Sequence, residues 1–176
     1  MKGSIIKLRA IEKCDIDLLY QWENNTNIWK VSNTIQPWSQ YVLSQYLEQA
    51  HLDIYSAKQI RFVIETIDKN IPVGLIDLFD FDPHHKRVGL GIMIANEKDY
   101  NKGYAYESIK LVIDYCFKIL FLKQVFCNIS SDNEKSINLF KKAGFELIGT
   151  KKQWNKVDFN KWNDELMFQF INQDII

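Results

Sequence analysis

The sequence is poor in the residues that mark unusual classes of protein. Only seven of its 176 residues are glycine and three are proline, which excludes a collagen-like chain and a disordered, low-complexity one. Its three cysteines, Cys14, Cys116 and Cys127, lie far apart and show no CxxC or Cys/His ligand spacing. An odd number of scattered cysteines indicates reduced thiols and a cytoplasmic protein rather than a disulfide framework.

Long apolar runs and an excess of one charge are also missing. No segment approaches the ~18 apolar residues of a membrane span, and Met1–Lys7 has no apolar stretch of the kind found in signal peptides. Lys plus Arg and Asp plus Glu number 22 each, so the formal net charge is zero. Nucleic-acid binders usually carry a basic excess, because phosphate contacts dominate their affinity. We therefore expect neither a membrane nor a nucleic acid as a partner.

What remains is the composition of an ordinary globular protein, with 47% hydrophobic and 25% charged residues. A chain of this length can bury a core without disulfides or metals. It has no internal repeat and no linker rich in proline, glycine or serine, which predicts one domain over residues 1–176. His84 and His85 have no cysteine or acidic ligand pattern beside them, so we expect no metal.

Hydrophobic periodicity predicts a mixture of helices and strands. A strand over Ser4–Arg9 is followed by two helices capped by Asp15 and Ser39. An antiparallel meander, two strand–helix units and two closing strands follow. The predicted ranges are Arg61–Thr66, Val73–Phe79, Val88–Ile94, a helix after Gly103, Gln124–Ile129, Glu134–Ala143, Glu146–Lys152 and Glu165–Ile171. The predicted fold class is α+β, with an α/β three-layer arrangement.

The most informative segment runs from Ile92 to Ala105 and reads IMIANEKDYNKGYA. It predicts a strand that leads through a polar turn into a helix with glycine near its start. The backbone N–H groups of such a junction, and the positive end of the helix dipole, can bind a pyrophosphate. Gly103 permits a close approach because it has no Cβ, and Lys102 can add a charge. The alternative is an ordinary strand–turn–helix with a glycine in the turn.

This segment resembles the acetyl-CoA loop of the GNAT acetyltransferase superfamily. The family pattern is Arg/Gln-x-x-Gly-x-Gly/Ala, and the sequence here is Tyr100-Asn101-Lys102-Gly103-Tyr104-Ala105. A second signature, Asn-x-x-Ala/Ser with a later aromatic residue and Gly-Phe, is matched by Asn133-Glu134-Lys135-Ser136, Phe140 and Gly144-Phe145. The order of elements is similar over nearly the whole chain. The resemblance implies a central mixed, mostly antiparallel sheet flanked by helices, and transfer of an acetyl group from acetyl-CoA to a primary amine.

The resemblance also implies which residues bind acetyl-CoA. Backbone groups of Ile92, Met93 and Ile94 would bind the thioester end and the pantetheine arm, and the Tyr100–Ala105 loop would hold the pyrophosphate. Asn133 would bind near the arm, cap the following helix, or do both. Tyr100 stands where the family has a basic or amide residue, and lysines nearby can compensate, namely Lys98, Lys102, Lys141 and Lys142.

Three segments are similar to ribosomal-protein and polyamine acetyltransferases, in particular to spermidine acetyltransferases: Leu8–Lys13, Gln21–Asn25 and Arg61–Glu65. This likeness implies a polyamine such as spermidine as the acceptor, while another small amine or a protein N-terminal amine fits the same chemistry. Relatives of this kind are commonly dimers or larger, so a homo-oligomer is expected. The segment Ile35–Val42 is poor in acidic residues, which argues against a regulatory polyamine site there.

Phe140 stands where this branch usually has a tyrosine that donates a proton to the leaving thiolate. Three interpretations remain open. The thiolate can leave unassisted, because a thiol with a pKa of ~8.5 is a fair leaving group. Tyr104 or Tyr106 can supply the missing hydroxyl. Alternatively, the protein binds the cofactor and catalyses poorly, which at its limit makes it a non-catalytic CoA-binding or regulatory module.

The strand before the phosphate loop also lacks the glutamate that relatives often use as a base, which leaves Glu23, Asp77 and Asp80 as candidates. Strand alternation predicts Asp77 and Phe81 on one face and Asp80 on the other. A carboxylate buried among apolar side chains has a raised pKa and can accept a proton near neutral pH. Alternatively, these are solvated charges, which can attract a cationic amine.

Overall fold

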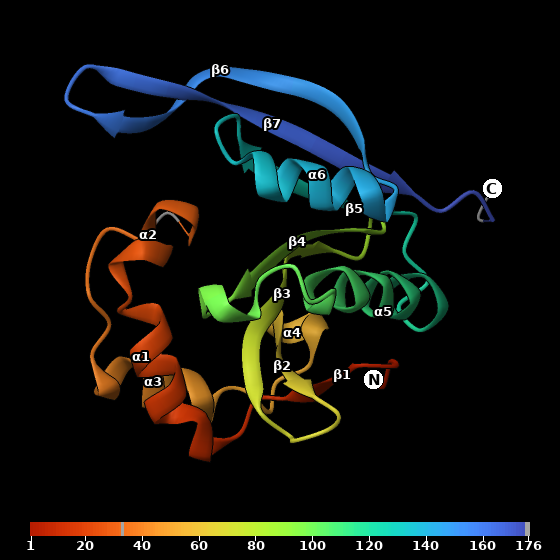
Figure 1. Cartoon of the computed structure of the whole chain (residues 1–176). Helices are drawn as coiled ribbons and strands as arrows, with labels where there is room; N and C mark the ends of the chain where they lie inside the picture. The colour runs from red at the N-terminus through yellow and green to blue at the C-terminus, as the bar shows by residue number, and fades with distance from the viewer. Residues whose placement is uncertain (33, 175–176) are drawn as a thin grey trace.

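A computed structural model describes residues 1–32 and 34–174 and contains one continuous seven-stranded sheet, ordered β1-β2-β3-β4-β5-β7-β6. Strands β4 and β5 are parallel, and the other neighbours are antiparallel. The strands are β1 (Ile6–Ala10), β2 (Ile60–Thr66), β3 (Pro72–Asp82), β4 (Arg87–Ile94), β5 (Gln124–Ser130), β6 (Glu146–Asp158) and β7 (Lys161–Ile171). This confirms the predicted mixed, mostly antiparallel sheet with flanking helices (Figure 1).

The helices are α1 (Ile16–Glu23), α2 (Thr26–Ser32), α3 (Gln40–Glu48), α4 (Ile54–Ala57), α5 (Tyr104–Lys118) and α6 (Glu134–Ala143), with two 3₁₀ turns, η1 (Lys13–Asp15) and η2 (Glu97–Asp99). Ser39 caps α3 as predicted, since its hydroxyl accepts the N–H of Val42 at 3.2 Å. Asp15 precedes α1 but makes no side-chain cap there. Its carboxylate binds Arg9 instead, at 2.7 and 2.8 Å. The short helices α2 and α4 were not predicted.

Helices cover both faces of the sheet. On one face α1 and α3 pack against β2 and β3 through Leu19, Trp22, Leu43, Leu47, Val63 and Leu75. On the other face α5 and α6 bury Ile109, Val112, Ile113, Cys116, Phe140 and Ala143 against the sheet. Figure 1 shows α1 and α3 to the left of the strands and α5 to the right. The helices therefore form the outer two layers, and the sheet forms the middle one.

The alternation of side chains along β3 reverses at Asp80. The register of β3 against β4 shifts between Phe79 and Asp82, and Asp80 has a φ of +50°. Phe81 consequently joins Ile76 and Leu78 in the core on the α5 side. The prediction that Phe81 shares a face with Asp77 is therefore wrong, because a bulge inserts an extra residue and reverses the alternation beyond it.

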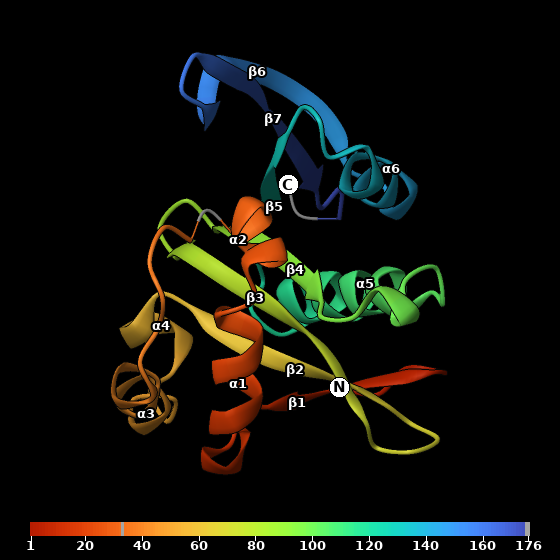
Figure 2. The ribbon, with the colours of Figure 1, turned by 60° about the vertical axis from the view of Figure 1, so that its left-hand side comes forward.

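The last two strands are longer than predicted and form an extended hairpin. Strand β6 continues to Asp158, and β7 begins at Lys161 rather than at Glu165. Figure 2 shows this hairpin projecting past the rest of the sheet. Its far end exposes Trp154, Phe159 and Trp162, with Phe159 83% exposed.

The parallel strands β4 and β5 pair only where they begin. Arg87, Val88 and Gly89 lie opposite Gln124, Val125 and Phe126, and no further pairs follow in the described chain. Residues 90–94 of β4 therefore have one edge without a strand partner. The resulting opening in the sheet creates the space for a site.

Candidate active site

Two cavities meet at the opening between β4 and β5. The first has a volume of about 720 Å³ and lies between β4, the 97–103 loop, α5 and α6. The second has a volume of about 580 Å³ and is lined by residues of α2, β4, β5, α6 and the β6–β7 hairpin. Ile92, Asn133 and Ser136 line both cavities. Two ligands, one in each cavity, could therefore meet beside these three residues.

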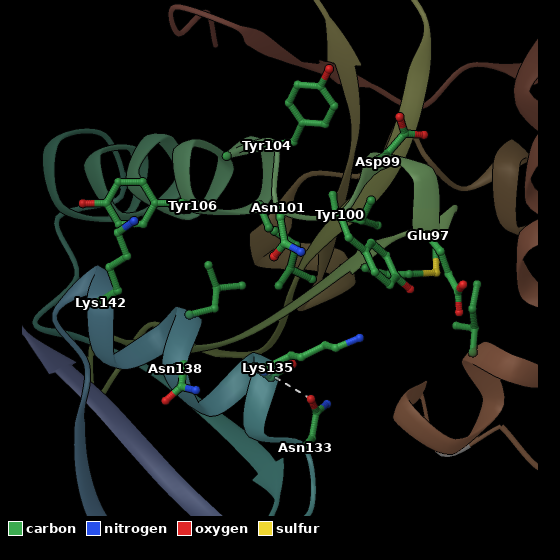
Figure 3. Close-up of a pocket in the computed structure, with 18 of the residues that line it drawn as sticks. Glu97, Asp99, Tyr100, Asn101, Tyr104, Tyr106, Asn133, Lys135, Asn138 and Lys142 are labelled. Atoms are coloured by element: carbon green, nitrogen blue, oxygen red, sulfur yellow. Dashed lines mark hydrogen bonds between the residues drawn. The ribbon is translucent and has the colours of Figure 1, made fainter.

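The first cavity brings together ten of the eleven residues that the sequence analysis assigned to acetyl-CoA. They are Ile92, Met93, Ile94, Tyr100, Asn101, Gly103, Tyr104, Ala105, Asn133 and Lys142. The eleventh, Lys102, does not line the cavity, and its ammonium lies 2.9 Å from Asp99 Oδ1. Lys102 thus neutralises an acidic residue of the lining. Figure 3 shows Asn101 and Tyr100 on the loop before α5, with Asn133 and Lys142 on the α6 side of the same cavity.

The loop before α5 has the backbone shape of an anion-binding site. Asn101 and Gly103 have φ values of +60° and +85°. Left-handed residues of this kind turn successive N–H groups into one concavity. Among the described residues, no protein group accepts a hydrogen bond from the amides of residues 101–106, and no side chain caps α5. These donors, at the positive end of a 15-residue helix, fit the diphosphate of CoA.

Two lysines add positive charge to the first cavity. The ammonium of Lys142 lies 5.0 Å from the ring centre of Tyr106, and that of Lys135 lies 5.4 Å from the ring centre of Tyr100. Figure 3 shows Lys142 and Tyr106 facing each other from α6 and α5. Tyr100 therefore brings a cation to the position where the family pattern has a basic or amide residue. Lys135 was not among the compensating lysines that the sequence suggested.

Asn133 caps α6 and lines both cavities. Its Oδ1 accepts the N–H of Ser136 at 3.1 Å, which satisfies one amide of the first turn. Its side-chain Nδ2 makes no hydrogen bond within the described chain. The cap and a contact with a ligand are therefore compatible, as the sequence suggested.

The structure joins two of the three predicted bases to an arginine. Arg61 Nε and Nη2 lie 2.7 and 2.9 Å from the two oxygens of Asp77, and Nη1 lies 2.5 Å from Glu23 Oε1. Burial disfavours the charge of Arg61, but Asp77 and Glu23 outweigh this effect and raise the pKa of the guanidinium. Neither carboxylate lines either of the two cavities, and neither does Asp80, which is exposed at the bulge of β3.

Phe140 lines the second cavity, where it is 3% exposed and packs edge-on against Phe145 at 5.0 Å. Tyr104 and Tyr106, the proposed substitutes for a tyrosine at this position, line only the first cavity. Figure 3 shows the ring of Tyr104 on the side away from α6. Ser136 lies one helical turn before Phe140 and carries a hydroxyl at the junction of the cavities. In the sequence, Ser136 could be identified because it occupies the Ala/Ser position of the second signature.

Sequence reasoning missed the polar residues of the second cavity. Its lining includes two carboxylates, Asp132 and Glu165, together with the indole of Trp29 from α2. Asp132 accepts a hydrogen bond from Ser130 Oγ at 2.6 Å, and Glu165 binds Lys151 at 2.7 Å.

Across residues 1–32 and 34–174, no group of three His, Cys, Asp or Glu side chains could hold a metal ion. Over the same residues, no helix combines the length and apolarity needed to cross a membrane.

Comparison with known proteins supplies the family. A model of the acetyltransferase (GNAT) domain matches residues 6–146. Spermidine N(1)-acetyltransferase of Vibrio cholerae is 30% identical over 143 residues, which cover 81% of this chain and 80% of that protein. The crystal structure of spermidine N-acetyltransferase from Vibrio cholerae in complex with CoA and spermine superposes with a TM-score of 0.85, at 24% identity and 96% coverage of both chains. A dodecameric structure of the same enzyme superposes with a TM-score of 0.77 at 22% identity, covering 96% of this chain and 95% of that one. At these identities the two structures show a shared fold.

Proposed function

This chain belongs to the GNAT acetyltransferase family and is an N-acetyltransferase, and we propose that its acceptor is a small polyamine such as spermidine. The family consists of acetyl transfer enzymes, which favours catalysis over a non-catalytic CoA-binding module. The observation that carries the proposal is the junction of the two cavities. One offers unpaired backbone donors to a diphosphate, and the other offers carboxylates to an amine.

In this proposal the first cavity binds acetyl-CoA, which supplies the activated acetyl thioester. The amides of residues 101–106 hold the diphosphate, and Lys135 and Lys142 add to the positive potential. The free edge of β4 at Ile92, Met93 and Ile94 binds the extended pantetheine arm, as it would bind another strand. Asn133 contributes its side-chain amide. Together, these contacts direct the thioester toward the second cavity.

The acceptor nitrogen reaches the thioester carbon from the second cavity in its neutral form. A C–N bond forms, the C–S bond breaks, and one proton passes in net from nitrogen to sulfur. Met93 lies opposite Leu75, and because Ala95 N–H donates to Val73 O in the same register, the N–H of Met93 also points to β3. The N–H groups of Ile92 and Ile94 point to the free edge instead, and we propose that one of them stabilises the carbonyl oxygen.

Phe140 cannot donate the proton, so sulfur receives it from solvent or from a hydroxyl. Ser136 carries a hydroxyl at the junction of the cavities, whereas Tyr104 would first have to turn its ring toward α6.

The roles of the predicted bases follow from their partners. Glu23 and Asp77 contribute two negative charges against the single positive charge of Arg61. We propose that this cluster, together with exposed Asp80, favours the approach of a cationic amine through its field. Deprotonation of the amine would then proceed through water in the second cavity.

We further propose that the enzyme assembles as a homo-oligomer and acts in the cytoplasm. An edge strand presents unpaired backbone groups that can pair with another chain, and β6, at the edge of the sheet, exposes Leu147, Ile148 and Val157 at 49, 49 and 43%. Burial raises the pKa of Cys116 and of Cys127 to about 12. Both buried thiols therefore stay protonated and unreactive, which is consistent with a protein whose cysteines stay reduced.

The decisive experiment combines binding and turnover. Acetyl-CoA should raise the melting temperature of the purified protein, because a ligand that binds only the native state stabilises it. A panel of spermidine, spermine, simple monoamines and a peptide with a free N-terminus should then release free CoA only in the presence of an accepted amine. Binding without thiol release from any amine between neutral and alkaline pH would contradict the proposal.

A further inference from the structure

The second cavity contains a buried carboxylate whose own contact with the acceptor has not been specified above. Glu165 lies on β7, is 7% exposed, and lines this cavity together with Asn163 two residues earlier. Leu166 and Phe168 belong to the core on the α5 side. Because side chains alternate along a strand, Glu165 points to the other face of the sheet, where the acceptor would enter.

Cross-strand partners hold Glu165 in place and leave one of its oxygens weakly used. Lys151 lies opposite Glu165 in the β6–β7 register, and its ammonium is 2.7 Å from Oε2. Within the described residues, the one hydrogen bond of Oε1 is with Asn155 Nδ2 at 3.4 Å. A carboxylate has about four acceptor positions. Oε1 therefore retains capacity for a strong donor that arrives through the cavity.

The surroundings of Glu165 suit an aliphatic chain that ends in an ammonium group. The inner wall of the cavity is apolar and buried, and is formed by Leu90, Cys127 and Phe140. Trp29 adds an aromatic surface from α2. The cation of the described lining is Lys156, whose ammonium lies 6.0 Å from the ring centre of Phe159 near the tip of the hairpin.

We propose that Glu165 is a specificity-determining residue that binds the second, non-reacting ammonium group of a diamine or polyamine acceptor. The inference rests on the proposed function and concerns the amine end of the same site. The reacting nitrogen is neutral and lies beside Asn133 and Ser136. The distant nitrogen stays protonated at neutral pH and donates to Glu165 Oε1, which makes a charge-assisted hydrogen bond. A monoamine with the same carbon chain lacks this contact.

The test compares the Glu165→Gln variant with the wild type on matched amines. The probes are 1,4-diaminobutane with n-butylamine and 1,5-diaminopentane with n-pentylamine. Each is measured for turnover with acetyl-CoA and for binding by calorimetry. Loss of the charge should raise the KM and the Kd of the diamines by about tenfold or more, since hydrogen bonds to charged groups are the stronger class. The monoamines and acetyl-CoA should change by less than about twofold.

Two control variants separate the charge of Glu165 from its structural role. Lys151→Met breaks the same ion pair but keeps the carboxylate, so it should retain the preference for diamines. Asp164→Asn disrupts the neighbouring pair, in which Lys152 lies 2.8 Å from Asp164. Asp164 does not line either cavity, so this variant should leave all amine constants unchanged. Glu165→Asp provides a second acidic variant in case Gln lowers the melting temperature.

The possible results distinguish the two proposals. A wild-type protein that binds acetyl-CoA but transfers no acetyl group contradicts the proposed function, and the calorimetric comparison still tests Glu165. Equal binding of diamines and monoamines by the wild type overturns the role of Glu165. So does an equal loss for both classes in Glu165→Gln, or a loss of the diamine preference in Lys151→Met.

Discussion

Arg61 binds both carboxylate oxygens of Asp77, with Nε 2.7 Å from Oδ1 and Nη2 2.9 Å from Oδ2. Its remaining nitrogen binds Glu23 at the end of α1. The carbonyl oxygen of Glu23 accepts the indole N–H of Trp29 at 2.7 Å, so the cluster also ties α2 to the sheet. Because Trp29 lines the second cavity, this arginine connects the fold of the N-terminal helices to the shape of the acceptor site.

Removal of Arg61 should therefore destabilise the protein strongly. In Arg61→Met, two carboxylates would face each other without a counter-charge, and loss of one partner of a largely buried pair costs about 2–5 kcal/mol. We expect a fall of at least about 2 kcal/mol in the free energy of unfolding, measured by urea denaturation. The KM for the amine should rise more than the KM for acetyl-CoA, because α2 borders the acceptor cavity.

Arg87 provides the matched control for Arg61. Its guanidinium lies 3.2 Å from Asp82 at the surface, where its side chain is 48% exposed. Exposed pairs of this kind contribute roughly 0–1 kcal/mol, so Arg87→Met should change stability little. Similar losses in both variants would show that the Arg61 cluster has no special role.

Gly103 should be required for tight binding of acetyl-CoA. An alanine at its φ of +85° is strained, by about 1–2 kcal/mol, and its Cβ would lie 3.4 Å from Ile5 Cδ1. It would also crowd the amides proposed to hold the diphosphate. We expect Gly103→Ala to weaken acetyl-CoA binding by about tenfold or more in calorimetry.

Gly149→Ala is the corresponding control, since a Cβ there meets no atom within 4 Å. It should bind acetyl-CoA like the wild type. If Gly103→Ala also bound normally and kept its melting temperature, the diphosphate could not lie against the start of α5.

The features predicted correctly from the sequence depend on residues close together in the chain. Gly103 sits before a helix with an evident apolar stripe, and Asn133 precedes another helix by one residue, so short-range spacing was enough to identify both. The same reasoning works for Ser39, whose cap bond spans three residues. Local backbone chemistry determines these contacts, and the sequence alone therefore reveals them.

The features missed depend on strand register and on distant pairings. Asp77 was named as a candidate base without its partner Arg61, which β2 places opposite it, because a charged neighbour 16 residues away cannot be read from spacing. The bulge at Asp80 reverses which face of the sheet the following side chains of β3 point to, and no glycine in the sequence indicates this bulge. Glu165 enters the second cavity because β7 pairs with β5, where it lies opposite Ser130. Pairings of this kind are decided by the packing of the whole sheet.

Glu107 should stabilise the protein in a pH-dependent manner. It lies in the first turn of α5 and accepts the backbone N–H groups of Ser4, Ile5 and Ile6 at 2.6, 3.0 and 2.9 Å. Burial opposes its charge, but these three donors outweigh burial and lower the pKa of the carboxyl below its ordinary 4.5. A lowered folded-state pKa means that the stabilisation is complete above about pH 4.5 and is lost as the pH falls through the folded value.

The comparison of wild type with Glu107→Gln tests this dependence. We expect a difference of about 1–2 kcal/mol in the free energy of unfolding at pH 7, from hydrogen bonds to a charged acceptor, and a smaller difference below pH 4. Glu134→Gln is the control, because Glu134 also lies in the first turn of a helix. This variant measures the contribution of a carboxylate to the helix dipole alone, which is about a few tenths of a kcal/mol. A difference between wild type and Glu107→Gln that is constant from pH 7 to pH 3 would contradict the assignment.

Phe140→Tyr should accelerate departure of the thiolate. Phe140 lines the second cavity one turn after Ser136, and we propose that a hydroxyl on this ring comes within reach of the thioester. General acid catalysis typically contributes about a hundredfold or more. A hydroxyl in the best position would raise the rate by nearly that factor. The hydroxyl of Phe140→Tyr, without other changes to position it, should raise the rate by about tenfold. The measurement is the single-turnover rate of CoA release at saturating amine.

Phe145→Tyr controls for adding a hydroxyl to the same aromatic pair. Phe145 is 3% exposed and packs edge-on against Phe140, but it lines neither cavity. Its hydroxyl would be buried without a partner, which costs about 1–3 kcal/mol of stability and should bring no gain in rate. If Phe140→Tyr folds normally and releases CoA no faster than the wild type, proton donation at this position does not limit the reaction. The natural phenylalanine would then be consistent with a thiolate that leaves without an acid.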